Sequence, residues 1–122
     1  PKKAFQQLFS EALTRWISGE HEADYPESWS QFKTRCKQGL DHVVANAKAS
    51  QHIAVFTSGG PISTNVQQHL QVPDSNVQTL NWAMVNCSVT HFLYNENGIS
   101  LNYFNNYTHL QSATDNKFVT YR

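Results

Sequence analysis

An apolar run that stops at a small-residue turn constrains the fold of this chain more than any other feature. The run covers residues 52–57, and the turn follows as Ser58-Gly59-Gly60-Pro61, where a helical pattern begins. Glycine lets the backbone bend sharply, and proline suits a first helical position because its missing N–H would be unpaired there. The sequence therefore predicts a strand over residues 52–57 that leads into a helix over residues 61–71.

The amides at the start of such a helix favour anions, because they lack intrahelical partners and lie at the positive end of the helix dipole. We expect Ser58, Gly59 and Gly60 to bind a phosphate or a carboxylate there. The alternative is a tight strand-to-helix turn without a ligand. An arginine or lysine usually supplements a phosphate site, yet residues 51–116 contain neither. The cations would then come from another part of the protein.

The remaining pattern predicts an α/β fold with a mainly parallel sheet flanked by helices and a C-terminal antiparallel hairpin. Apolar residues recur at helical spacing over residues 3–18 and 27–48, and we expect both apolar stripes to be buried in the core. A short helix is predicted over residues 75–81. The strands of the hairpin are predicted over residues 84–94 and 99–105, around an Asn-Glu-Asn-Gly turn.

Composition places the chain among single-domain globular proteins, with one domain over residues 1–122. Hydrophobic residues make up 39% and charged residues 15% of the sequence. The sequence has no apolar run of membrane-spanning length and no signal-peptide pattern, which predicts a cytoplasmic protein without membrane contact. A net charge of zero without a basic stripe excludes a nucleic-acid groove.

Histidine and cysteine spacing gives no reason to expect a metal or another cofactor. None of the six histidines has the His-x-x-x-His spacing of a zinc site. Cys36 lies in a helical pattern and Cys87 in a strand pattern. We therefore expect two buried free thiols, and the alternatives are a disulfide or a metal pair.

Four short motifs follow one another in an order that resembles a known family. They are Pro26-Glu27-Ser28 with Arg35, Thr57-Ser58-Gly59-Gly60, Asn86-Cys87-Ser88, and Asn105 with His109-Leu110. The set is similar to the histidine phosphatase superfamily, also called phosphoglycerate mutase-like. Its members carry Gly-Glu-Ser with a later arginine, Ser-His-Gly-Gly after a strand, an asparagine that opens the next strand, and a final Asn–gap–His-Leu.

The resemblance implies a hydrolase or mutase that transfers phosphoryl groups of phosphomonoesters through a phosphohistidine. It places Ser58, Gly59 and Gly60 in the phosphate pocket, with Glu27, Asn86 and His109 as support behind it. The family's Arg-His-Gly strand, which carries the nucleophilic histidine, is absent from these 122 residues. The chain thus resembles a C-terminal portion, with no catalytic residue of its own and no activity by itself. The absent strand would lie between residues 52–57 and 84–94, so we expect an N-terminal segment or a second copy as partner.

Ser58 stands where most of the family has a second histidine, and the Ser-Gly-Gly version is similar to a bacterial branch. A hydroxyl offers one neutral hydrogen bond where an imidazolium offers a charged one. The alternative function is therefore a non-catalytic protein that binds a phosphorylated small molecule or acts as an interaction partner. Ser58 is no serine-hydrolase nucleophile, because it lacks the leading glycine of Gly-x-Ser-x-Gly. For Glu27 the alternatives are an acid–base group and a helix-dipole partner, and for His109 a structural hydrogen bond.

Overall fold

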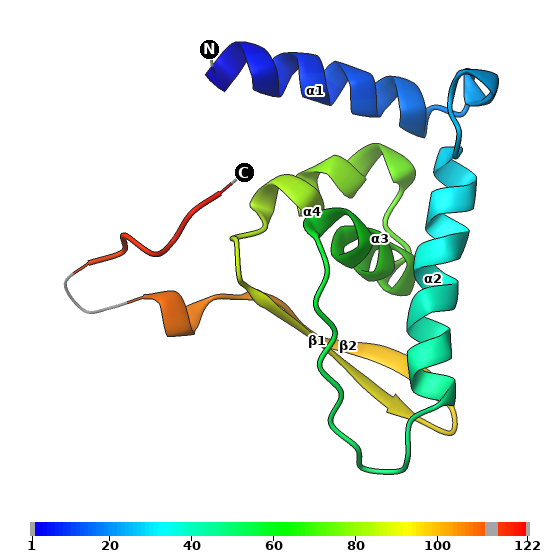
Figure 1. Ribbon diagram of the computed structural model, residues 1–122, viewed down its shortest axis with the longest axis vertical. Coiled ribbons are helices and arrows are strands. Elements are labelled where there is room, and N and C mark those ends of the chain that lie inside the picture. The colour runs from blue at the N-terminus through cyan, green and yellow to red at the C-terminus, as the bar shows by residue number, and fades with distance from the viewer. Residues whose placement is uncertain (1, 112–114, 122) are drawn as a thin grey trace.

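Four α-helices and one β-hairpin form the described part of the chain, residues 2–111 and 115–121 of a computed structural model (Figure 1). The elements are α1 (Lys2–Ile17), α2 (Trp29–Ala45), α3 (Gly59–Leu70), α4 (Val77–Ala83), β1 (Val89–Asn95) and β2 (Gly98–Asn106). Single 3₁₀ turns occupy Glu22–Asp24, Asp74–Asn76 and Thr108–Leu110. In Figure 1, α1 lies across one end of α2 and the hairpin lies toward the other end, with α3 and α4 between them.

Helix α2 begins two residues later than predicted, because Ser28 caps it. The Ser28 hydroxyl accepts a hydrogen bond from the Gln31 amide at 3.2 Å, and the Gln31 side chain accepts one from the Ser28 amide at 2.8 Å. This reciprocal capping box satisfies two backbone donors at the helix start. The helix ends at Ala45 rather than at residue 48, and a turn with a left-handed Ser50 follows.

The core gathers around α3, which packs against α2, α4 and β2. Val66 is 0% exposed, and Ser63, Thr64 and Gln67 on the same helix are also buried. Trp29 and Cys36 contribute from α2, and Val77, Met84 and Val85 from the region of α4. The helix starts at Gly59 rather than at Pro61, so Pro61 occupies its third position, where a backbone N–H has no intrahelical partner either.

The expectation that the apolar stripe of α1 is core is wrong. No residue of this helix is buried, and Phe5 and Leu8 remain 64% and 67% exposed. Periodicity correctly predicted the helix, because apolar residues recur at helical spacing. Periodicity does not report whether another element covers the apolar face of that helix. None of the helices in the described ranges combines the length and the hydrophobicity needed to cross a bilayer.

Residues 52–57 are not a strand, which corrects the sequence prediction. They run from the turn after α2 to Ser58 without a backbone hydrogen bond to any other described residue, and Figure 1 draws them as an irregular trace beside the hairpin. Three large apolar side chains on this segment are exposed, and Phe56 reaches 96%. An extended segment becomes a strand only when another strand pairs with it. The described residues contain a two-stranded antiparallel sheet, and no parallel pair is among them.

The C-terminal hairpin is present, but its first strand starts at Val89 rather than at residue 84. Asn95 pairs with Gly98 across the turn, and Phe92 pairs with Leu101. Before β1 the chain turns, with the Ser88 amide bonded to the Val85 carbonyl at 3.1 Å and Cys87 at a φ of 63°. Cys87 is consequently exposed, which corrects the expectation of two buried thiols, whereas Cys36 is buried and free as expected.

Candidate functional site

The predicted phosphate-binding residues lie at the N-terminal end of α3. Ser58 caps the helix with extended backbone angles, φ −97° and ψ 171°, and its side chain makes no capping hydrogen bond. Gly59 is buried and begins the helix. No described residue accepts a hydrogen bond from the amide of Gly59 or Gly60. These two amides are therefore free to bind an acceptor, whereas the Ile62 amide already bonds the Ser58 carbonyl at 3.4 Å.

Helix α2 brings an aromatic and a cationic side chain to this end of α3. A Cβ placed on Gly60 would lie 3.6 Å from Cζ of Phe32, which is ordinary van der Waals contact. The Arg35 guanidinium carbon lies 5.2 Å from the centre of the Phe32 ring, in cation–π geometry. Phe32 thus lies beside Gly60 and also contacts the Arg35 guanidinium.

Glu27 uses its carboxylate to hold Arg35. The Arg35 Nε and Nη2 groups donate to the two carboxylate oxygens at 2.7 and 2.8 Å, a bidentate pair. These hydrogen bonds hold the pKa of the Glu27 carboxyl below its usual value. Trp16 Nε1 also donates to the Glu27 carbonyl at 2.8 Å and so fixes the backbone of this residue. An ionised carboxylate can orient a cation but cannot act as a proton donor near neutral pH.

Asn86 precedes β1 and His109 bonds near it, and no described hydrogen bond joins either residue to residues 58–60. Asn86 donates two hydrogen bonds to Thr120, from its amide to the carbonyl at 2.9 Å and from Nδ2 to the hydroxyl at 3.0 Å. His109 Nε2 lies 3.1 Å from the Cys87 carbonyl, an oxygen that can only accept. The structure therefore shows His109 in a structural hydrogen bond, and support of the phosphate pocket by Asn86 and His109 stays a prediction.

The sequence did not predict the structural role of Asn105, which lies near the end of β2. Its Oδ1 accepts from the Val85 amide at 2.9 Å, and its Nδ2 donates to the Ala83 carbonyl at 2.8 Å. It also adopts a left-handed φ of 59°. The signal in the sequence is an asparagine in an otherwise strand-like run, because asparagine is depleted in strands and tolerates left-handed angles.

The described ranges, 2–111 and 115–121, contain no group of three His, Cys, Asp or Glu side chains that could hold a metal ion.

The chain matches the family model of the histidine phosphatase superfamily (branch 1) over residues 1–107. Neither the search of curated proteins nor that of solved structures found a match. Because the family match covers most of the sequence, the chain belongs to the histidine phosphatase superfamily.

Proposed function

We propose that this chain is the C-terminal part of an enzyme that transfers or hydrolyses phosphoryl groups of phosphomonoesters through a phosphohistidine. Membership of the superfamily supports this proposal. The nucleophilic histidine and its arginine would come from an Arg-His-Gly strand, a motif that these 122 residues lack. The ligand at the Gly-Gly turn would be a phosphorylated small molecule, and the enzyme would act in the cytoplasm.

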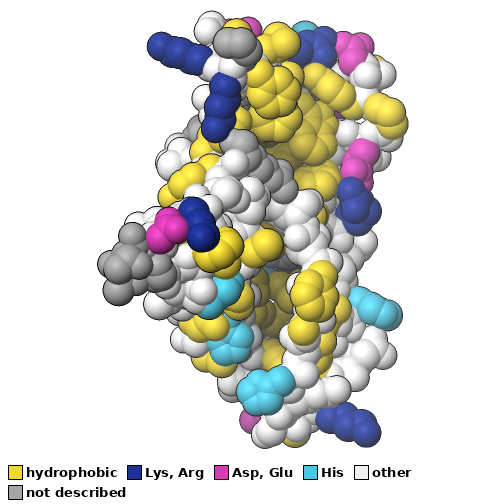
Figure 2. Space-filling view, turned by 60° about the vertical axis from the view of Figure 1, so that its left-hand side comes forward, with side chains coloured by type: hydrophobic (Ala, Val, Ile, Leu, Met, Phe, Trp, Pro, Cys, Tyr) yellow, Lys and Arg dark blue, Asp and Glu magenta, His cyan; other side chains and the backbone are white. Residues whose placement is uncertain are grey.

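The observation that carries the proposal is the unpaired segment at residues 52–57. The Tyr94 hydroxyl lies 2.8 Å from the carbonyl oxygens of both Lys48 and Gln51, so the end of β1 is tied to the start of this segment. Beyond that point the segment and β1 share no hydrogen bond. A strand inserted between them would pair with both edges and complete a mainly parallel sheet. Figure 2 shows hydrophobic side chains around a hollow near the middle of one face.

Such a strand would also supply the charge that the turn lacks. No lysine or arginine occurs between residues 51 and 116, and two nitrogen atoms of Arg35 already donate hydrogen bonds to the Glu27 carboxylate. A dianionic phosphate is held more strongly when a guanidinium joins the backbone amides. The arginine and histidine of an Arg-His-Gly motif would deliver that charge next to Gly59 and Gly60.

Two measurements test this proposal. Inorganic phosphate added to the ¹⁵N-labelled chain should shift the amide signals of Gly59 and Gly60 more than those of the hairpin, because both amides are free. The 122-residue chain should show no phosphomonoesterase turnover. A chain lengthened at its N-terminus by the preceding codons of its gene should show turnover that a His→Ala change in its Arg-His-Gly motif abolishes.

The opposite results would contradict the proposal. Turnover by the 122-residue chain that survives repurification and disappears in His109→Ala would place the nucleophile in this chain instead. Glycine amides that stay unmoved while other signals respond to phosphate would place the anion site elsewhere.

A second candidate is a non-catalytic phosphate-binding protein, and the chemistry at the turn favours it. Ser58 offers a neutral hydroxyl where most of the family has histidine, and the pKa of Glu27 is lowered by its pairing with Arg35. Losing a charged donor at a phosphoryl group costs about 10²- to 10³-fold in rate. A lengthened chain that binds phosphate at Gly59 and Gly60 but shows no turnover would identify this second function.

A further inference from the structure

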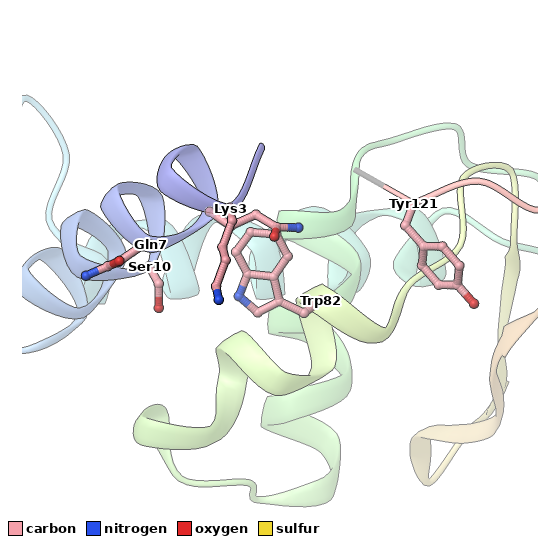
Figure 3. A pocket seen from close by; sticks show the side chains of 6 residues that line it. Lys3, Gln7, Ser10, Trp82 and Tyr121 are labelled. Atoms are coloured by element: carbon pink, nitrogen blue, oxygen red, sulfur yellow. The ribbon is translucent and has the colours of Figure 1, made fainter. Parts of the chain in front are cut away.

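An open cavity of about 550 Å³ lies between α1, α4 and the C-terminal segment, apart from the Gly-Gly turn residues. Figure 3 shows side chains from all three parts around it, with the Trp82 indole between Lys3 and Tyr121 in this view. Its lining consists of Lys3, Gln6, Gln7, Ser10, Trp82 and Tyr121. Its volume lies within the range of small-molecule pockets.

The cavity contains a cation without a partner. Two of its polar groups are already used, because Ser10 Oγ donates to Gln78 at 2.9 Å and Gln7 Nε2 donates to Glu11 at 3.2 Å. The Lys3 ammonium has no hydrogen-bond or ion-pair partner among the described residues. The five ion pairs within the described ranges all involve other lysines and arginines. Lys3 is therefore available to an external anion.

Trp82 adds an apolar wall and a second free donor. Phe9 holds the indole in an edge-to-face contact, with ring centres 5.8 Å apart and planes at 82°. Phe5 stacks on Phe9 in turn at 5.9 Å, so the indole is backed by a row of rings. The indole nitrogen donates to no described residue. In Figure 3 this nitrogen and the Lys3 ammonium point to the same side of the cavity.

A cation, a free N–H group and an aromatic surface together suit one kind of ligand. The geometry points to a binding site for a small aromatic anion, a planar ring that carries a phosphate, phosphonate or carboxylate group. The anionic group would lie between Lys3 Nζ and Trp82 Nε1, and the ring would pack along the indole. This site uses none of residues 58–60, so it goes beyond the proposed phosphoryl chemistry.

The side-chain N–H signals of tryptophan test this site directly. The chain has three tryptophans, and Trp82→Phe assigns the signal that disappears. Titration with phenylphosphonate should shift the Trp82 signal in a saturable manner at millimolar concentration, while the signals of Trp16, bonded to Glu27, and of buried Trp29 stay in place. Benzoate should bind the same site, and inorganic phosphate alone should move the Trp82 signal far less.

A pair of lysine variants separates the site from general charge attraction. Lys3→Gln should weaken phenylphosphonate binding by about fivefold, the factor expected for one partly screened charge contact. Lys2→Gln is the matched control, since Lys2 precedes Lys3 on the same helix but does not line the cavity, and it should leave the affinity unchanged. Equal effects of the two variants, or a Trp82 signal that never saturates, would overturn the proposal. The glycine amides of the turn report on the proposed phosphate site in the same spectra, so either site can fail alone.

Discussion

Asn105 gives the sharpest test of how the hairpin is joined to the helical part of the chain. Asn105→Ala removes the acceptor of the Val85 amide, and Val85 is only 2% exposed. A buried donor left without a partner costs about 1–3 kcal/mol. The substitution also places alanine at a φ of 59°, which costs about 1 kcal/mol relative to a residue that tolerates this angle. We expect the free energy of unfolding to fall by about 2–4 kcal/mol from these two terms together.

Urea unfolding followed by tryptophan fluorescence measures this loss, and Asn105→Gly separates its two causes. Glycine accepts the left-handed angle but makes neither side-chain hydrogen bond, so it should recover the backbone share and retain the loss of about 1–3 kcal/mol. If the free energy of unfolding of Asn105→Ala lies within about 0.5 kcal/mol of that of the unchanged chain, as for an ordinary surface substitution, the reasoning is refuted. Full recovery by glycine would assign the whole effect to the backbone and none to the bonds with Val85 and Ala83.

Three further predictions follow from burial, charge and unpaired edges. Val66→Ala should cost about 2 kcal/mol in urea unfolding, because Val66 is 0% exposed, while Phe56→Ser should change stability by less than about 0.5 kcal/mol. Burial alone would raise the pKa of the Asp74 carboxyl, but hydrogen bonds from Lys33 and Gln67 lower it overall from 3.8. Stability contributed by Asp74 is therefore present above that value and lost as pH falls through the lower folded pKa, and Asp74→Asn should remove this part of the acid dependence. Sedimentation should show that the isolated chain associates as its concentration rises, since residues 52–57 and β1 expose unpaired edges, and a strictly monomeric chain would contradict this.

The sequence predicted helices better than it predicted what covers them. The helical spacing of apolar residues located α1 and α2 to within a few residues, because that spacing is a property of the segment itself. The start of α2 depends on the Ser28 and Gln31 side chains, a local pattern that spacing does not include. Burial of α1 and pairing of residues 52–57 depend on other segments, and no local pattern reports whether such a segment is present.

The same distinction applies to the candidate site. Glycine, glycine and proline in succession predicted a helix that starts in this turn, since each of these residues has a local conformational preference. The structure has the start at Gly59, two residues before the predicted Pro61, and phosphate binding by the Gly59 and Gly60 amides stays a prediction. The pairing of Glu27 with Arg35 was not predicted, although both residues belong to the motif that resembles the family. This ion pair joins a residue before the capping box to one in the second turn of α2. The distance between the two side chains depends on where the helix begins, and helical spacing alone did not locate that start.

The unpaired segment and the missing charge would both be accounted for by the strand proposed above. Residues 52–57 leave backbone donors and acceptors without strand partners among the described residues. The Gly-Gly turn that follows has free amides, and residues 51–116 contain no lysine or arginine. A strand without arginine would pair with residues 52–57 but would leave the turn without a cation. A cation at the turn without a strand would leave residues 52–57 unpaired. The proposed strand that carries Arg-His-Gly would meet both needs at once, because a strand that pairs with residues 52–57 would end beside Ser58 if it ran parallel to them.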